Sequence, residues 1–454
     1  MKKIVALIFL ISSFAQAQFT VKGTLTKTLD TDWVILYRID ASKQKFLQNT
    51  KIKIDTILVD GKKQTIGTFQ FQLPTDSKIG SYKINYSTNG SGSVGFIFNN
   101  ENVSFTFHPD YPERTVLFSE SKENIIYKNY LQEVFIQQQK LDSLQITAIE
   151  NPALDLKLNY KKTLSRIHNI LQKYLEETKE MYVKPFIKAS LRTNSPEIKT
   201  TRKEYWSDRK TSFFDNIGFS NKALINSTFL LDRITEYIFY LNYSESKETL
   251  QKLYKIAIDT IFSKVKNTVF KKNIIVFLIE RFEKTENLEM IDFLFKNYYD
   301  KLPTSLKSEK FKNEKIVLFT TGIGRIAPDF FWKENEKKLQ LSTLNEAKNY
   351  VLVFWSTDCS HCLKEIPELH KLLRDKKAVK VVAFSMEKND FRWKKMIATL
   401  PNWHHILGLN KWENKIAKMY NISGTPTYIV LDANKKIIAK PLTIGKLSAY
   451  LEKL

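Results

Sequence analysis

The sequence of 454 residues contains only two cysteines, Cys359 and Cys362. Zinc is normally held by four protein ligands, or by three in a catalytic site, and no second cysteine pair exists to complete such a set. His404 and His405 could complete a ligand set with the cysteines, so metal binding remains the less favoured hypothesis. A structural disulfide between residues so close in sequence would constrain the unfolded chain very little. The pair therefore favours a dithiol that opens and closes one disulfide, and no cofactor is expected.

The chain also lacks any long hydrophobic run after its first residues. Two lysines precede an apolar stretch from Ile4 to Phe14, which ends in the small-x-small pattern Ala15-Gln16-Ala17. A membrane-spanning helix needs roughly 20 apolar residues, so the pattern predicts a signal peptide over residues 1–17, cleaved near Gln18. No cysteine follows the cleavage site, which excludes lipid attachment of the bacterial lipoprotein kind. We expect a soluble, exported, periplasmic protein without stable membrane insertion.

The formal net charge of +23 raises the question of a nucleic-acid partner. The lysines are spread along the whole chain among asparagine, isoleucine and glutamate, and they form no block or stripe. Export would also separate the protein from chromosomal DNA. We therefore expect a lysine-rich solvated surface and no nucleic-acid partner. The hydrophobic content of 43% is ample for packed cores, and this length predicts two or three domains.

Hydrophobic periodicity divides the chain after residue 17 into three parts. Residues 18–118 alternate with period two between turn signals, which predicts a small β-sandwich of antiparallel strands. Residues 119–318 follow the helical period and predict an all-helical region, in which Asn151-Pro152 supplies the cap and first position of the second helix. Residues 322–454 alternate strands and helices and predict an α/β sheet with crossover helices. The strands expected there are 351–355, 379–384, 427–431 and 437–439, and the helices are 362–374, 391–400, 413–420 and one at the end of the chain.

The two cysteines lie where the expected strand 351–355 gives way to the helix that follows it. The N-terminus of a helix presents free backbone N–H groups and a positive partial charge. Both favour a thiolate over a thiol. Cys359, at the helix start, is therefore the candidate nucleophile.

Several motifs around the cysteines occur together and in order. They are Ala327-Pro328-Asp329-Phe330, Val353-Phe354-Trp355, Cys359-Ser360-His361-Cys362, Glu365, Pro367 and Gly424-Thr425-Pro426-Thr427. In this combination residues 322–454 resemble the TlpA-like branch of the thioredoxin superfamily, which is far more specific than a CxxC pair alone. By its pattern, the β-rich front section resembles the domain of unknown function that precedes such modules in exported proteins of Bacteroidota.

The resemblance implies a role for each matched residue. Cys359 would attack a substrate disulfide, and the more buried Cys362 would resolve the mixed disulfide. A cis peptide bond is expected before Pro426, so that the backbone of Thr425 can pair with the extended chain of the substrate. Glu365 matches an acidic residue that could handle protons for Cys362, with a solvated helix residue as an equal alternative.

Three positions, Val353, Glu365 and Asp358, depart from the thioredoxin pattern and bear on the redox potential, and His361 opposes the two acids. Val353 stands where ordinary thioredoxins carry a buried aspartate. Asp358 replaces the usual tryptophan before the first cysteine, and its charge is expected to raise the pKa of the thiol. His361 occupies the position where oxidases of the DsbA type carry a histidine that stabilises the thiolate. These opposing effects predict an intermediate potential.

The sequence thus predicts an exported thiol-disulfide oxidoreductase. The resemblance implies that it reduces disulfides of protein clients, receives electrons from a membrane dithiol carrier and could serve cytochrome c maturation. An oxidase or isomerase is the alternative within the same class. A client- or envelope-binding protein with a docking thioredoxin-like module, and a copper carrier, are alternatives of other classes.

Overall fold

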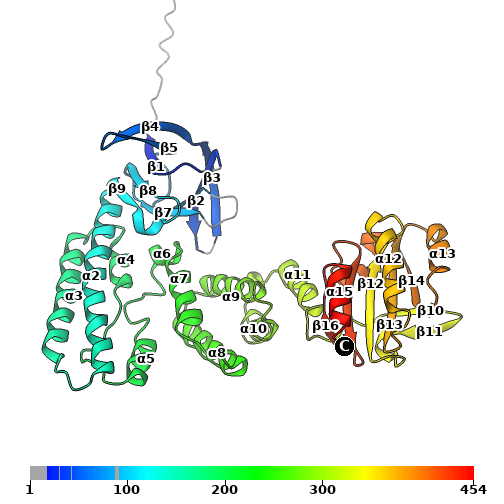
Figure 1. The fold of residues 1–454 in the computed structure, drawn as a ribbon. Helices are drawn as coiled ribbons and strands as arrows, with labels where there is room; N and C mark the ends of the chain where they lie inside the picture. Colours follow the sequence, from blue (N-terminus) through cyan, green and yellow to red (C-terminus); the bar gives the residue numbers. More distant parts are fainter. Residues whose placement is uncertain (1–17, 30, 42, 87–91, 454) are drawn as a thin grey trace, which may run out of the picture. The chain divides into compact units, whose positions relative to one another are not determined.

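The computed structural model describes residues 18–29, 31–41, 43–86 and 92–453. The predicted signal peptide, residues 1–17, lies outside the described residues. The chain separates into two compact units, residues 1–281 and 282–454 (Figure 1). The first unit holds the strand-rich front section and most of the helices, and the second holds both cysteines.

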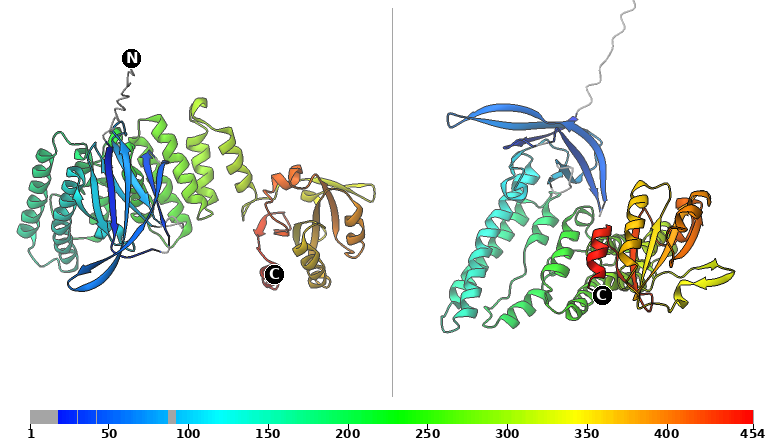
Figure 2. Two further views of the ribbon diagram at one scale, coloured as in Figure 1. Left: turned by 90° about the horizontal axis from the view of Figure 1, so that it is seen from above. Right: turned by 45° about the vertical axis from the view of Figure 1, so that its right-hand side comes forward.

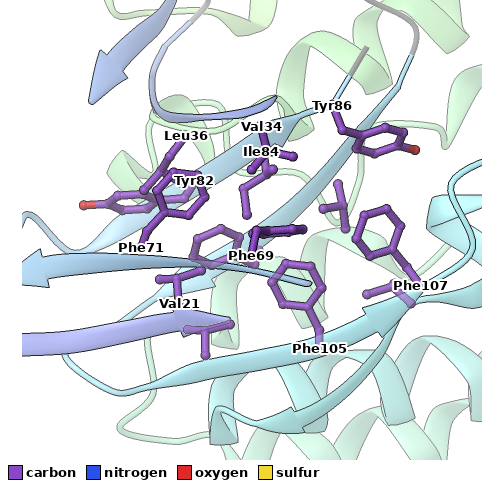
Figure 3. Packing of buried hydrophobic residues seen from close by; sticks show 14 of the residues in the cluster. Val21, Val34, Leu36, Phe69, Phe71, Tyr82, Ile84, Tyr86, Phe105 and Phe107 are labelled. Carbon is purple, nitrogen blue, oxygen red and sulfur yellow. The ribbon is translucent and has the colours of Figure 1, made fainter. Parts of the chain in front are cut away.

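The first unit begins with a β-sandwich of two sheets, in the strand orders β4-β5-β1-β8-β9 and β3-β2-β6-β7. Alternate residues of the facing strands are buried between the sheets, among them Phe69, Tyr82 and Phe105 (Figure 3). The predicted sandwich is therefore confirmed. Its strands are β1 (Gln18–Leu25), β2 (Trp33–Asp40), β3 (Lys43–Lys51), β4 (Lys53–Val59), β5 (Lys62–Pro74), β6 (Gly80–Asn85), β7 (Ser93–Phe98), β8 (Val103–Phe107) and β9 (Leu117–Glu120), with the short helix α1 (Pro112–Thr115) before β9.

One strand pair differs from the antiparallel prediction. β1 pairs with β8 in parallel, with Val21 opposite Val103 and Leu25 opposite Phe107. Parallel neighbours need a long connection, and β2 to β7 lie between these two strands in the sequence. The alternation of apolar residues reports only which face is buried, so it could not reveal this direction.

The helical part of the first unit starts with two long helices, α2 (Lys122–Glu150) and α3 (Lys157–Glu177), which lie side by side (Figure 2). The prediction that Asn151-Pro152 begins the second helix is wrong, because Asn151 is the C-cap of α2 and α3 begins at Lys157. The remaining helices are α4 (Lys184–Ser190), α5 (Arg202–Thr211), α6 (Lys222–Ile225), α7 (Phe229–Thr235), the π-helical turn η1 (Glu236–Tyr240), α8 (Lys247–Lys264) and α9 (Thr268–Glu283).

Two buried polar residues at the start of α2 attach the helices to the sandwich. The side chain of Asn124 accepts from the N–H of Ile97 at 2.8 Å and donates to its C=O at 2.6 Å. Glu123 accepts hydrogen bonds from the backbone N–H groups of Tyr182 and Val183 at 3.0 and 2.8 Å. Because these groups are buried and paired, they fix the first turn of α2 against both β7 and the segment before α4.

The second unit carries an α/β sheet in the order β14-β13-β12-β15-β16. β12, β13 and β14 run parallel to one another, β15 pairs antiparallel with β12, and β16 pairs antiparallel with β15. This arrangement confirms the predicted fold class. The strands are β10 (Phe331–Glu334), β11 (Lys337–Gln340), β12 (Asn349–Trp355), β13 (Val379–Glu387), β14 (His404–Leu409), β15 (Thr427–Asp432) and β16 (Ile437–Ala439). The helices are α10 (Leu288–Leu294), α11 (Glu309–Thr320), α12 (Ser360–Leu373), α13 (Phe391–Ile397), α14 (Lys415–Met419) and α15 (Ile444–Leu451), with the short turns η2 (Phe295–Tyr299), η3 (Thr304–Leu306), η4 (Leu341–Thr343) and η5 (Lys411–Glu413).

The sequence did not predict β14 or the hairpin β10–β11. β14 has a weak strand pattern because two histidines open it and a glycine interrupts it. β14 forms because its backbone pairs with β13. The glycine is needed there, because a Cβ atom at Gly408 would lie only 2.3 Å from the ring of Phe384. The helices α10 and α11, which the periodicity placed in the helical region, belong to the second compact unit. In the described part of the chain, no helix combines the length and hydrophobicity needed to cross a bilayer.

Candidate active site

The two cysteines lie at the first turn of α12, directly after the buried strand β12. Cys359 is the N-cap residue of α12, and its sulfur accepts a hydrogen bond from the N–H of Cys362 at 3.3 Å. The helix therefore begins at Ser360, two residues earlier than the sequence predicted. Since the N-cap position faces the unpaired N–H groups of the first turn, the Cys359 sulfur lies where a negative charge is stabilised.

The environment of Cys359 lowers the pKa of its thiol. Partial burial opposes ionisation, but hydrogen bonding with the side chains of Cys362 and Thr425 and with the backbone N–H groups of Cys362 and His361 outweighs it. The thiolate is thus favoured by donors that the first turn of the helix supplies.

Cys362 lies in the opposite environment. Its side chain is fully buried, and this burial, together with the hydrogen bond to Cys359, raises the pKa of the thiol to about 12. The two sulfurs are close enough to share a hydrogen bond, and they differ strongly in proton affinity. Such a pair combines an accessible nucleophile with a protonated second thiol that is held in reserve.

The loop before β15 approaches the same sulfur. The peptide bond between Thr425 and Pro426 is cis, as the sequence predicts. The Cys359 thiol donates to the carbonyl oxygen of Thr425 at 3.2 Å. Four of the six predicted site residues, Cys359, Cys362, Thr425 and Pro426, therefore lie together.

The other two predicted residues lie on α12 beside this group. The side chain of His361 is exposed, and the contribution of this residue to the Cys359 thiolate comes from its backbone N–H. Glu365 is half-buried and accepts a hydrogen bond from the hydroxyl of the buried Tyr428 at 2.8 Å. Burial and this carboxylate raise the pKa of Tyr428, and the nearby Cys362 adds to the shift. Glu365, Tyr428 and Cys362 therefore form one electrostatic cluster.

The charge of Asp358, which the sequence predicted to raise the pKa of Cys359, is compensated by two cations. Its carboxylate pairs with Lys411 at 2.5 Å and with Arg392 at 3.2 Å. The hydrogen bond and charge of Lys411, and then the charge of Arg392, lower the pKa of Asp358. The pKa of Cys359 is lowered although this acid is its neighbour, and hydrogen bonds are the cause of the lowering. Arg392 lies on α13 and Lys411 on η5, and the sequence could not place either element near the cysteines.

Glu387, at the end of β13, is a site residue that sequence reasoning missed. Its side chain is only 3% exposed. One carboxylate oxygen accepts from the N–H of Thr357 and from the hydroxyl of Ser385, both at 2.6 Å, and the other accepts from the Thr357 hydroxyl at 2.8 Å. Glu387 thus holds the turn that delivers Cys359 to the start of α12. The only available signal was an acid close to the end of an apolar strand, three residues after the predicted strand 379–384.

The histidines considered as metal ligands have other partners. The ring nitrogens of His404 lie 2.9 Å from Glu334 and 3.3 Å from Glu346, and His405 Nε2 lies 2.8 Å from the carbonyl oxygen of Leu400. Within the described ranges, no group of three or more histidine, cysteine, aspartate or glutamate side chains is arranged to hold a metal ion. Both histidines are therefore engaged in packing β14 onto its surroundings.

Comparison with known proteins shows what the second unit resembles. Residues 346–437 match the family model described as thioredoxin-like. The second unit carries a thioredoxin-like domain. Among curated proteins, the thiol-disulfide oxidoreductase ResA of Bacillus cereus is 28% identical over 138 residues, which are 29% of this chain and 78% of ResA. ResA of Bacillus anthracis is 28% identical over 141 residues, again 29% of this chain and 78% of the relative.

Two solved structures are also similar to part of this chain. The thioredoxin domain of a thiol-disulfide oxidoreductase from Bacteroides vulgatus is 28% identical, with a TM-score of 0.26, and the alignment covers 29% of this chain and 96% of that one. A thiol:disulfide interchange protein from a Bacteroides species is also 28% identical, with a TM-score of 0.26, covering 30% and 91%. The sequence relatives and the family model together confirm the TlpA-like resemblance, and the domain is a thiol-disulfide oxidoreductase.

The unequal pKa values of the two thiols predict unequal reactivity. Iodoacetamide reacts with the thiolate, so the alkylation rate of each cysteine rises as pH passes its pKa. For Cys359 we expect a midpoint below the value of free cysteine, about 8.5, whereas Cys362 should stay unreactive until pH approaches about 12. Fragment-ion mass spectrometry separates the two sites in the wild-type chain.

The urea-unfolded chain is the control for this titration. There both cysteines should react with the same midpoint, because the helix start and the burial are lost. A Cys359 midpoint in the folded protein at or above that of the unfolded chain would contradict the thiolate assignment.

Proposed function

We propose that the protein is an exported reductant of protein disulfides that acts in the periplasm. The asymmetry of the dithiol carries the proposal: Cys359 is half-buried with a lowered pKa, whereas Cys362 is buried with a raised pKa. The signal-peptide pattern supports export, and the resemblance to the TlpA-like branch supports the reducing direction.

In the proposed cycle, the Cys359 thiolate attacks one sulfur of a client disulfide. The bond Cys359–S–S–client forms, and the second client sulfur leaves as a thiolate. Cys362 then loses its proton and attacks the Cys359 sulfur, which releases the first client sulfur and closes the Cys359–Cys362 disulfide. The client gains two electrons and two protons. A membrane dithiol carrier returns two electrons to the protein for the next cycle.

The surroundings of Cys359 suit an extended client chain. The carbonyl of Thr425 lies beside the sulfur and could accept a hydrogen bond from the backbone of the client once the thiol is deprotonated. A cavity of about 450 Å³ lies beside Asp358, between the turn before Cys359 and the start of α13. The ring of Phe391, at its rim, is 66% exposed and offers an apolar contact.

The experiment that tests the proposal is capture of clients by Cys362→Ser in the native envelope. Without the resolving thiol, clients should stay covalently bound to Cys359 and be released by dithiothreitol. The double variant Cys359→Ser/Cys362→Ser is the matched control and should capture nothing. Equal recovery from the two variants would refute client exchange, and a wild-type protein found mainly as the disulfide in cells would refute the reducing direction.

The resolving step predicts a role for Glu365. Since the pKa of Cys362 is raised to about 12, very little thiolate exists at neutral pH, and a base must take its proton. Glu365 lies one helical turn from Cys362 and shares Tyr428 with it. We expect Glu365→Gln to slow the decay of a preformed mixed disulfide by roughly 10–100-fold, measured in a stopped-flow thiol-release assay.

Tyr428→Phe is the control for this variant. It removes the hydroxyl that binds Glu365 but leaves the carboxylate in place, so its effect should be clearly smaller. Unchanged decay in Glu365→Gln would show that Glu365 is not the base and would leave proton removal to water.

A further inference from the structure

A cavity of about 550 Å³ lies within the first unit, between the β-sandwich and the helices α2 and α7. This volume falls within the range of about 300–1,000 Å³ that is usual for ligand sites. The unit contains neither cysteine, so the cavity is separate from the redox site. Most of its larger wall residues are apolar or aromatic, and they include Phe96, Phe118, Leu131, Phe186 and Phe229.

One wall of the cavity is the edge of a β-sheet. β7 is the last strand of its sheet and pairs only with β6. The C=O of Gly92 accepts from the N–H of Tyr86 at 3.0 Å, so the even-numbered residues of β7 direct their backbone groups toward β6. Ser93, Gly95 and Ile97 therefore direct their N–H and C=O groups outward.

Only one of these three residues is paired. The amide side chain of Asn124 accepts from and donates to Ile97, as a neighbouring strand would. Ser93 and Gly95 continue the edge into the cavity, and Gly95 is exposed. Among the described residues, none donates to or accepts from the outward backbone groups of these two. An open strand edge of this kind is a template for an added strand.

Asp232 of α7 adds a charge to the opposite wall. It forms no salt bridge with any residue in the described ranges. Asp232 is an exposed residue that lines the cavity, so its carboxylate is only partly desolvated. This partial burial raises its pKa, and hydrogen bonding with Thr228 and the charges of Arg233 and Lys83 offset the shift only in part. A cation brought into the cavity would therefore meet a carboxylate without an ion-pair partner among the described residues.

We propose that this cavity binds an extended peptide that adds a strand to the edge of β7 and directs a lysine or arginine side chain toward Asp232. The backbone of the peptide would pair with Ser93 and Gly95, and its apolar side chains would cover the aromatic walls. This is β-strand addition, in which backbone hydrogen bonds give affinity and side-chain pockets give selectivity. The first unit would then hold a peptide segment independently of the redox chemistry in the second.

The test uses the full mature chain and a fluorescein-labelled peptide, Gly-Val-Lys-Val-Thr-Val amide, followed by fluorescence anisotropy at 0.15 M salt. Three matched peptides accompany it: one with N-methylated valines, which cannot form the strand pairing, and two with norleucine or glutamate in place of lysine. We expect N-methylation to weaken binding at least about 10-fold, and lysine to bind more tightly than norleucine and glutamate.

Two variants locate the peptide. Gly95→Pro removes the outward N–H while leaving the ladder to β6 intact, and should weaken binding at least about 10-fold. Asp232→Asn should abolish the preference for lysine over norleucine, whereas Asp76→Asn, which removes an exposed acid outside the cavity, should not. If circular dichroism shows that Gly95→Pro is misfolded, the N-methylated peptide and Asp232→Asn decide the question.

The proposal is overturned if the parent peptide shows no binding up to about 1 mM, or if the N-methylated peptide binds equally well. It is also overturned if Asp232→Asn leaves the lysine preference unchanged, or if glutamate is preferred.

Discussion

Replacing Cys359 with serine is expected to lower the rate of insulin disulfide reduction by roughly 1,000-fold or more, to the rate of the chemical reductant alone. The hydroxyl of serine is not ionised near neutral pH and does not attack a disulfide, so the first step of exchange is lost. The donors that lower the pKa of Cys359 remain in place, but they have no thiolate to stabilise. Turbidity of reduced insulin, followed with dithiothreitol as electron source, measures the effect.

Cys362→Ser separates the two steps of the reaction. This variant keeps the nucleophile, so it should form one covalent adduct with a disulfide substrate and then stop. A protein mass that increases by one substrate thiol would show this directly. Turnover by Cys359→Ser equal to that of the wild type would remove the enzymatic assignment of the dithiol. Release of the substrate thiol from the Cys362→Ser adduct without any added thiol would show that resolution does not need the second cysteine.

Glu387→Ala is expected to destabilise the turn before Cys359 by about 3–5 kcal/mol. The substitution leaves the N–H and hydroxyl of Thr357 and the hydroxyl of Ser385 without the carboxylate that accepts from them. These groups are buried, since Thr357 is 4% exposed and Ser385 is fully buried. Hydrogen exchange followed by mass spectrometry should show faster exchange of the peptide that contains Thr357.

Glu387→Gln and Ser385→Ala remove only part of these hydrogen bonds and should have smaller effects. Glutamine keeps one acceptor oxygen for Thr357, so its effect should fall between that of alanine and the wild type. Ser385→Ala removes a single hydrogen bond and leaves the Thr357 contacts intact, so about 1–2 kcal/mol is expected. Unchanged exchange in Glu387→Ala would mean that the turn is held by the packing of β12 and α12 alone.

Much of the fold could be predicted because burial leaves a periodic record in the sequence. The residues that alternate on Phe69 to Leu73 and on Val103 to Phe107 are buried between the sheets. The apolar run of β12 is buried along its length, as expected for a central strand. β14 escaped prediction because its stability comes from pairing with β13, and the parallel pairing of β1 with β8 escaped because direction leaves no periodic signal.

The candidate site also has features that the sequence predicted and features that it could not predict. The order of motifs predicted that Cys359, Cys362 and the cis bond before Pro426 belong together, and these residues do lie together. The effect of Asp358 could not be predicted, because its charge depends on Lys411 and Arg392 from distant segments. Neighbours along the sequence therefore do not show how much of the Asp358 charge reaches Cys359.

The sequence by itself determined the order of a β-sandwich, a helical stretch and an α/β sheet, the single dithiol and the helix start that favours a thiolate, because periodicity and local motifs act over short distances along the chain. Only the tertiary structure decided which charges meet at that helix start, that Glu387 supports the turn, and that the edge of β7 opens into a cavity. Electrostatic compensation and strand edges depend on contacts between segments far apart in the sequence, which no local pattern records.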